Sequence, residues 1–190
     1  MSELCDQNAV DLRRMIGSKE ISPVELLDSC INRIEAVNPT LNVVVSECYM
    51  RARDEAKAAE ADVMAGEPLG LLHGLPIGIK DLEATEGLRT TYGSKLYEDN
   101  VPEQDQVSVR NVRDEGGIVF CKTNTPEFGA GANTRNLVFG ATGNPFDPMK
   151  TCAGSSGGSA VALATGMMPI ASGSDYGGSL RTPAAYSGVV

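Results

Sequence analysis

Apolar positions recur at helical spacing through the first third of the chain. A capping box with proline at the first helical position begins at Ser22, and apolar residues then repeat every three or four positions as far as Val37. Because proline cannot donate a backbone hydrogen bond, we expect Asn38-Pro39 to stop this helix. A short strand over 41–45 and an alanine-rich helix over 47–65 are expected to follow.

The pattern changes after Gly66, where glycines become frequent and short apolar runs alternate with helical stretches. Alternation of this kind favours an α/β sheet. We therefore expect an N-terminal helical region, residues 1–66, packed on an α/β core, residues 67–190. Within the core, strands are predicted over 75–80, 118–122 and 168–172, helices over 103–115 and 159–165, and the start of a further helix over 179–185.

The end of the chain is apolar. Residues 186–190 have the sequence of a turn that enters a new strand, and no polar tail follows. Chain termini are usually exposed and polar. We therefore expect the chain to be the N-terminal part of a larger α/β core, truncated at its C-terminus.

Composition narrows the functional classes. The formal net charge of −9 excludes the basic surfaces that nonspecific nucleic-acid or anionic-membrane binding requires. No basic segment followed by an apolar core begins the chain, and no apolar run is long enough to span a bilayer. The five cysteines form no CxxC pair and there is a single histidine, which predicts reduced thiols, no metal site and a cytoplasmic location.

Two glycine-serine clusters, residues 154–159 and 175–179, contain the candidate chemistry. Glycine-rich junctions of this kind bind phosphates, present a nucleophile or allow close packing. Neither glycine-rich cluster has the spacing of a phosphate-binding or dinucleotide-binding loop. Serine hydroxyls beside exposed backbone N–H groups instead supply a nucleophile and donors for an oxyanion.

A serine nucleophile needs a base, and the residues offer two. Residues 154–158 match G-x-S-x-G, but the serine-histidine hydrolases with this motif need a histidine after the serine, and the sole histidine, His73, precedes it. We interpret His73 as a structural hydrogen-bonding residue. Lys80 ends an apolar strand, where desolvation would lower its pKa. From the residues alone, Lys80 is either such a base or a surface charge.

Longer motifs around these residues resemble the amidase signature family. They comprise residues 73–81, 122–129, 143–148, 154–160 and 173–184, and the resemblance covers roughly residues 20–190. The resemblance implies the amidase signature fold, a mixed β-sheet flanked by helices, with no cofactor and no metal. It implies a stand-alone serine amidase that cleaves a carboxylic amide to acid and ammonia or amine through an acyl-enzyme.

Within that resemblance, a Ser–cisSer–Lys triad maps onto three residues. Ser179 corresponds to the nucleophile, Ser155, after a cis peptide bond, to the bridging serine, and Lys80 to the base. The oxyanion hole is expected from backbone N–H groups, and three further side chains are expected to support the site. The oxyanion residues are Tyr176, Gly177 and Gly178, and the supporting residues are Ser156, Asp175 and Arg181.

Two departures from the family pattern occur next to the bridging serine. Ala153 stands where the family usually has glycine, and a methyl group there is expected to be tolerated. Cys152 is expected to pack without a catalytic role.

Two alternatives stay open. One is the A-type component of an amidotransferase that acts on glutamyl- or aspartyl-tRNA, although residues 125–129 look more like stand-alone amidases. The other is a non-catalytic remnant or binding module. The expected partner is a small-molecule amide substrate, without nucleic acid or membrane, and a homodimer is left open.

Overall fold

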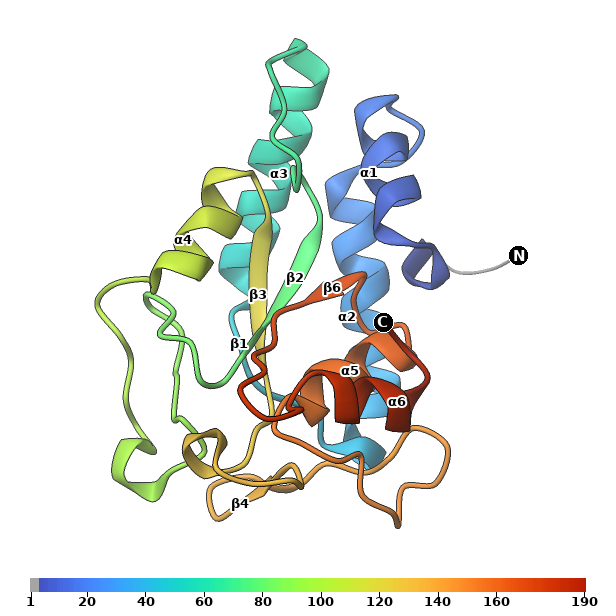
Figure 1. Ribbon diagram of the computed structural model, residues 1–190. Helices are drawn as coiled ribbons and strands as arrows, with labels where there is room; N and C mark the ends of the chain where they lie inside the picture. The colour runs from blue at the N-terminus through green and yellow to red at the C-terminus, as the bar shows by residue number, and fades with distance from the viewer. Residues whose placement is uncertain (1–3) are drawn as a thin grey trace.

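A four-stranded sheet lies at the centre of the molecule (Figure 1). The computed structural model describes residues 4–190. The strand order is β1 (Val44–Glu47), β3 (Ile118–Thr123), β2 (Pro76–Lys80), β6 (Ile170–Ala171). β2 pairs in parallel with both β3 and β6, whereas β1 pairs antiparallel with β3. The α/β fold with a mixed sheet is thereby confirmed.

Helices cover both faces of this sheet. They are α1 (Ala9–Gly17), α2 (Pro23–Leu41), α3 (Tyr49–Ala65), α4 (Val107–Asp114), α5 (Gly157–Ala164) and α6 (Arg181–Ser187). Three single 3₁₀ turns and a two-stranded ribbon complete the described elements: η1 (Leu4–Asp6), η2 (Lys95–Tyr97), η3 (Glu127–Gly129), β4 (Arg135–Asn136) and β5 (Gly140–Ala141). The division of the chain into residues 1–66 and 67–190 stays a prediction.

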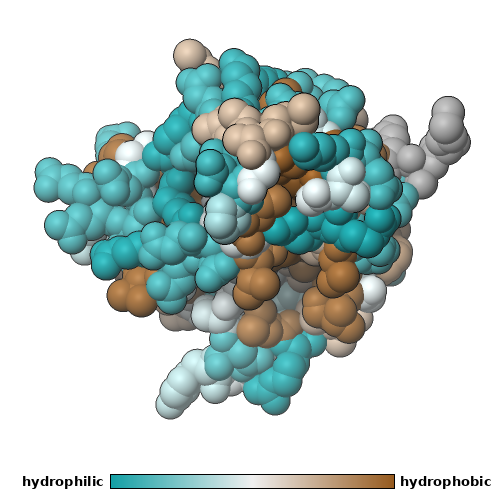
Figure 2. Space-filling model, turned by 90° about the horizontal axis from the view of Figure 1, so that it is seen from above, coloured by the Kyte–Doolittle hydropathy of each residue, from teal (hydrophilic) through white to brown (hydrophobic). Residues whose placement is uncertain are grey.

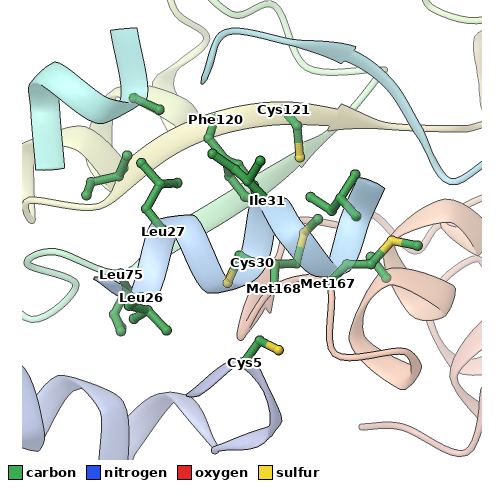
Figure 3. Close-up of a cluster of buried hydrophobic side chains, with 14 of the residues drawn as sticks. Cys5, Leu26, Leu27, Cys30, Ile31, Leu75, Phe120, Cys121, Met167 and Met168 are labelled. Atoms are coloured by element: carbon green, nitrogen blue, oxygen red, sulfur yellow. The ribbon is translucent and has the colours of Figure 1, made fainter. Parts of the chain in front are cut away.

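The larger core forms around α2, which begins at the expected capping box. The Ser22 hydroxyl accepts from the Glu25 amide, and the Glu25 carboxylate accepts from the Ser22 amide. The helix lies between β3 and α1, with Leu27 and Ile31 near Phe120 of β3 (Figure 3). The apolar spacing read from the sequence thus corresponds to a helix buried between two layers.

One predicted boundary is wrong, because α2 continues through Pro39 to Leu41. A proline in the last turn of a helix removes only one backbone donor. The Asn38 side chain stabilises this end, since its Oδ1 accepts from the amides of Val43 and Val44 at 2.7 and 2.8 Å. The following strand therefore starts later than expected, at Val44.

Other boundaries shift by a few residues. The helix expected from 103 begins at Val107, and the strand expected over 168–172 is reduced to Ile170–Ala171. At the end of the described chain, Ser187 completes α6 and Gly188 caps it in the left-handed conformation. The strand expected within 186–190 is therefore not formed, because residues 186 and 187 are helical.

Alternation along β2 decides where Lys80 points. Ile77 and Ile79 pack with Val109 of α4 on one face of the sheet. Lys80 therefore shares the opposite face with Gly78, which Met168 approaches and which α5 covers. The strand pattern places the lysine side chain inside the protein beneath α5, and the side chain is fully buried.

The exterior differs from this interior. Seen from above, hydrophilic residues cover most of the surface, with a band of apolar residues through the middle (Figure 2). No helix among residues 4–190 has the length and apolar character that crossing a membrane requires.

The glycines that begin α5 allow this helix to approach the strand layer closely. A Cβ atom on Gly158 would lie 2.5 Å from the Asn124 amide nitrogen and 2.6 Å from its carbonyl oxygen. Because both are backbone atoms, the contact cannot be relieved by a rotamer change. The start of α5 is thus fixed against the end of β3.

Gly158→Ala in the full-length protein is expected to lower the free energy of unfolding by about 1–3 kcal/mol. Urea denaturation measures this. Gly177→Ala is the matched control, because a Cβ atom there would meet no atom within 4 Å. Equal stability of the two variants would show that the close approach of α5 to Asn124 is not a packing constraint.

Candidate active site

The carboxyl ends of β2 and β6 and the start of α5 meet at one edge of the sheet (Figure 1). Lys80 is the last residue of β2, and Ser155 and Ser156 immediately precede α5. The second glycine-serine cluster follows β6. Parallel strands bring such segments together because their carboxyl ends lie on the same side of the sheet.

The Lys80 amine contacts three serine hydroxyls. Its Nζ lies 2.7 Å from Ser155 Oγ, 2.9 Å from Ser156 Oγ and 3.0 Å from Ser174 Oγ. A neutral amine has two N–H donors and one lone pair, so three partners satisfy it completely. If Ser156 and Ser174 accept its hydrogens, the lone pair faces the hydroxyl of Ser155.

Burial favours the neutral form of this lysine. Desolvation lowers the pKa of Lys80 from 10.5 to about 8, and the charges of Glu83 and Asp175 oppose part of that decrease. The N-terminal end of α5 begins at Gly157, close to the amine, and its positive dipole end also disfavours an ammonium ion. The expectation that Lys80 is buried, and not a surface charge, is confirmed.

Ser155 has the backbone geometry that the resemblance implies. The Gly154–Ser155 peptide bond is cis, and the Ser155 side chain is buried beside Lys80. Ala153 precedes it with φ at 61°, in the left-handed region. This conformation costs a residue with a Cβ about 1–2 kcal/mol, which explains why glycine suits this position. The alanine is accommodated, although in a strained conformation.

Ser179 is half-buried at the rim of the site. Its carbonyl accepts from the Ser156 amide at 3.1 Å, so its backbone is attached to the first cluster. Within residues 4–190 its hydroxyl makes no hydrogen bond, and none joins it to Ser155. The structure therefore brings Lys80 and Ser155 together and leaves the contact between Ser155 and Ser179 open. Catalytic hydrogen bonds are often long before substrate binds.

Asp175 fixes the loop that leads to Ser179. Its carboxylate accepts from three loop amides and from the Arg181 guanidinium, whose Nε and Nη2 lie 2.9 and 3.1 Å away. The Arg181 guanidinium, together with the Gly178 amide, holds the pKa of Asp175 well below its usual range. Both residues thus have the positions expected of supporting residues.

The same contacts change the expectation for the oxyanion donors. The Gly178 amide donates to Asp175 Oδ1 at 2.6 Å, so it is occupied in this structure. Among the described residues, the amides of Tyr176, Gly177 and Ser179 make no hydrogen bond. An oxyanion would therefore meet these three amides more readily than that of Gly178.

Two residues with unassigned roles lie in this region. Ser174, inside the recognised motif, contacts the Lys80 amine, and a second lysine, Lys122, is fully buried on β3. Desolvation lowers the pKa of Lys122 to about 8. Its Nζ donates to the Glu83 carbonyl and to Thr85 Oγ1, so it has no serine nucleophile beside it. A lysine within an apolar strand was the available sequence signal.

The residues set aside as structural are placed accordingly. The His73 ring contacts the Ala59 carbonyl at 2.9 Å, near the opposite end of β2 from Lys80. Cys152 is fully buried, and burial raises the pKa of its thiol to about 11. A thiol with this pKa carries little thiolate at neutral pH and is a poor nucleophile.

The comparisons with known proteins agree with this geometry. The family model for Amidase matches residues 25–190. The A-type component of a glutamyl-tRNA(Gln) amidotransferase from Acidothermus cellulolyticus is 42% identical over 190 residues, which is 100% of this chain and 38% of that protein. An acylamidase from Rhodococcus erythropolis is 41% identical over 183 residues, 96% of this chain and 38% of that protein.

Solved structures give the same result. The crystal structure of a bacterial aryl acylamidase of the amidase signature family matches with a TM-score of 0.92 and 38% identity, covering 97% of this chain and 38% of that one. The chain thus spans 38% of the length of these relatives. Since the family model covers most of the chain, the chain belongs to the Amidase family, the amidase signature enzymes.

Proposed function

We propose that the protein containing this chain is a serine amidase that hydrolyses a carboxylic amide to an acid and ammonia or an amine. The observation that carries the proposal is the 2.7 Å contact between a buried, desolvated Lys80 amine and the Ser155 hydroxyl. A lysine in this state can accept a proton at neutral to mildly basic pH, which a serine nucleophile requires.

In the proposed mechanism, Ser179 Oγ attacks the amide carbonyl carbon. Its proton passes to Ser155 Oγ as the Ser155 proton passes to Lys80 Nζ. The carbonyl oxygen becomes an oxyanion, which the amides of Tyr176, Gly177 and Ser179 stabilise; one such donor is typically worth about 3–4 kcal/mol. The tetrahedral intermediate then collapses to an acyl-enzyme.

The leaving amine takes the proton back through Ser155, because the C–N bond cannot break to an amide anion. Water then attacks the acyl-enzyme while the same relay removes its proton, and Ser179 is released with the acid. Ser156 and Ser174 orient Lys80, and Asp175 with Arg181 fixes the loop. The relay requires Ser179 Oγ to move within hydrogen-bonding distance of Ser155 when substrate binds.

A small-molecule amide is the proposed substrate, and we propose a cytoplasmic location for the protein. A homodimer remains compatible with the proposal. Residues 125–129, with Thr125-Pro126-Glu127-Phe128, favour the stand-alone amidase over the amidotransferase component.

The second candidate function is that of the A-type amidotransferase component, which the 42% identity to such a protein favours. Both candidates use the same three side chains, so the site geometry does not separate them. The partner does: the amidotransferase component hydrolyses glutamine within a complex that holds the tRNA, whereas an amidase acts alone.

The test uses the full-length protein purified alone. We expect it to release amine or ammonia from at least one of a panel of aryl, aliphatic and peptide amides, and a fluorophosphonate is expected to label Ser179, as peptide mass spectrometry would show. Glutaminase activity that appears only with tRNA and a second protein component would favour the other candidate. A Ser179 that fails to react, together with no hydrolysis, would indicate a binding module.

A further inference from the structure

The turn that follows β2 places a carboxylate next to the backbone of Lys80. The Glu83 amide donates to the Lys80 carbonyl at 3.1 Å and so closes the turn. The Ser172 hydroxyl accepts from the Lys80 amide at 2.9 Å and donates to Glu83 Oε1. Glu83 is thus connected to both backbone polar groups of Lys80, once directly and once through Ser172.

Further contacts hold Glu83 in place. Its carbonyl accepts from Lys122 Nζ, and its Oε2 accepts from the Ser108 hydroxyl at 2.6 Å. Lys122 is fully buried and pairs with Ile79 across the two central strands. The turn is therefore fixed from the interior of the sheet and from α4, and the Glu83 carboxylate cannot swing away without breaking two hydrogen bonds.

The charges around Lys80 single out Glu83. Two carboxylates favour its ammonium form, Glu83 and Asp175, and Glu83 has the larger effect. Asp175 is bound by the Arg181 guanidinium, whereas the Glu83 carboxylate accepts only from serine hydroxyls and forms no ion pair within residues 4–190. On the far side of the turn, Lys122 faces Glu83 and three other titratable groups: Asp81, Asp105 and Cys121.

We propose that Glu83 is a positioning residue of the amidase, which holds Lys80 through Ser172 and sets the pH range in which Lys80 acts as a base. This inference rests on the proposed function. Glu83 touches no reacting atom; it acts on Lys80.

The direction of the effect follows from the charge. The Glu83 carboxylate favours the protonated form of Lys80 and so opposes the desolvation that lowers its pKa. Removing the carboxylate charge must lower this pKa further. More of Lys80 is then neutral at acidic pH, and the rise of the reaction rate with pH begins earlier. A charge lost from a site that merely maintained the fold would reduce the rate at every pH without moving the midpoint.

The experiment measures the rate of Ser179 labelling by a fluorophosphonate against pH, because this readout needs no known substrate. Glu83→Gln in the full-length protein is expected to shift the midpoint by about 0.5–1 pH unit towards acid, at the low end of the effect of a nearby charge. Labelling at pH 6 would rise about three- to tenfold relative to the plateau, as such a shift requires. Glu83→Ala, which also removes the charge, is expected to shift in the same direction and is read if the glutamine variant does not fold.

Glu86→Gln is the matched control. Glu86 lies in the same turn region, is exposed, and its side chain makes no hydrogen bond or ion pair among the described residues. Its substitution is expected to leave the midpoint within about 0.2 unit, since an exposed charge at a distance is screened. A wild-type protein that labels normally, with the same midpoint in the Glu83 and Glu86 variants, would overturn this inference alone. A wild-type protein whose Ser179 does not react would overturn the proposed function and this inference with it.

Discussion

Ser179→Ala in the full-length protein is expected to reduce kcat/KM for amide hydrolysis by about 10⁴- to 10⁶-fold, as loss of a serine nucleophile does elsewhere. No other hydroxyl can replace it, since Ser155 is 3% exposed and its oxygen is engaged with Lys80. The fold is expected to be unchanged, because the Ser179 hydroxyl makes no hydrogen bond within residues 4–190. Hydrolysis assays at saturating and limiting substrate measure the effect.

Ser187→Ala is the matched control for this substitution. Ser187 is a buried serine eight positions further along, in α6, and its hydroxyl also has no hydrogen-bond partner among the described residues. We expect its activity to stay within about twofold of the wild type, since the change removes no polar contact. If Ser179→Ala kept most of the activity, Ser179 would not be the nucleophile, and the acyl-enzyme mechanism would have to be abandoned.

Lys80→Met is expected to reduce kcat/KM by about 10²- to 10⁴-fold, the usual contribution of a general base. Methionine keeps most of the side-chain length and suits the buried position, so the loss is chemical and not a failure to fold. Ser156 and Ser174 then have no amine to orient, and Ser155 has no group to which its proton can pass. The labelling rate of Ser179 by a fluorophosphonate is expected to fall in parallel.

The same variant reveals the protonation of Lys80 through stability. The pKa of Lys80 is about 8 in the folded protein and 10.5 as a free side chain. Below pH 8 both states hold the proton; between about pH 8 and 10.5 only the unfolded state does, so the stability contributed by Lys80 rises with pH in that window. Wild type is therefore expected to gain about 2–3 kcal/mol over Lys80→Met between pH 7 and pH 10.

Comparing the two proteins at each pH cancels the titration of the cysteines and tyrosines that they share. Lys95→Met, which removes a lysine whose side chain is 52% exposed, serves as the control and is expected to follow the wild type. Urea unfolding at each pH gives the free energies. A difference between wild type and Lys80→Met that stays constant with pH would mean that Lys80 is not held away from water, which would remove the physical basis of the base.

Local features of the fold could be predicted where the deciding contacts are close in sequence. The capping box at Ser22 depends on residues three positions apart, and it forms as expected. The end of the same helix was predicted wrongly, because the Asn38 side chain binds the chain after the helix and outweighs the single donor lost at Pro39. A rule about proline alone does not contain that contact.

The candidate site divides along the same line. Apolar neighbours in β2 made a buried Lys80 plausible, and the recognised motif made it specific. The role of Glu83 had no such signal, because it depends on Ser172, 89 positions away, and on the clamp from Lys122. The occupied Gly178 amide is a similar case, since only the folded loop shows that Asp175 uses it.

The amino-acid sequence by itself determined the α/β class, the order of most helices and strands, and the serine and lysine residues from which a site can be built. Only the tertiary structure decided which of these groups meet: Lys80 reaches serines 75, 76 and 94 positions away. The physical reason is that periodicity and capping arise from interactions within a few residues, whereas the site arises from the register of parallel strands and the close approach of α5. Those long-range contacts set both the distances and the desolvation that give the lysine its chemistry.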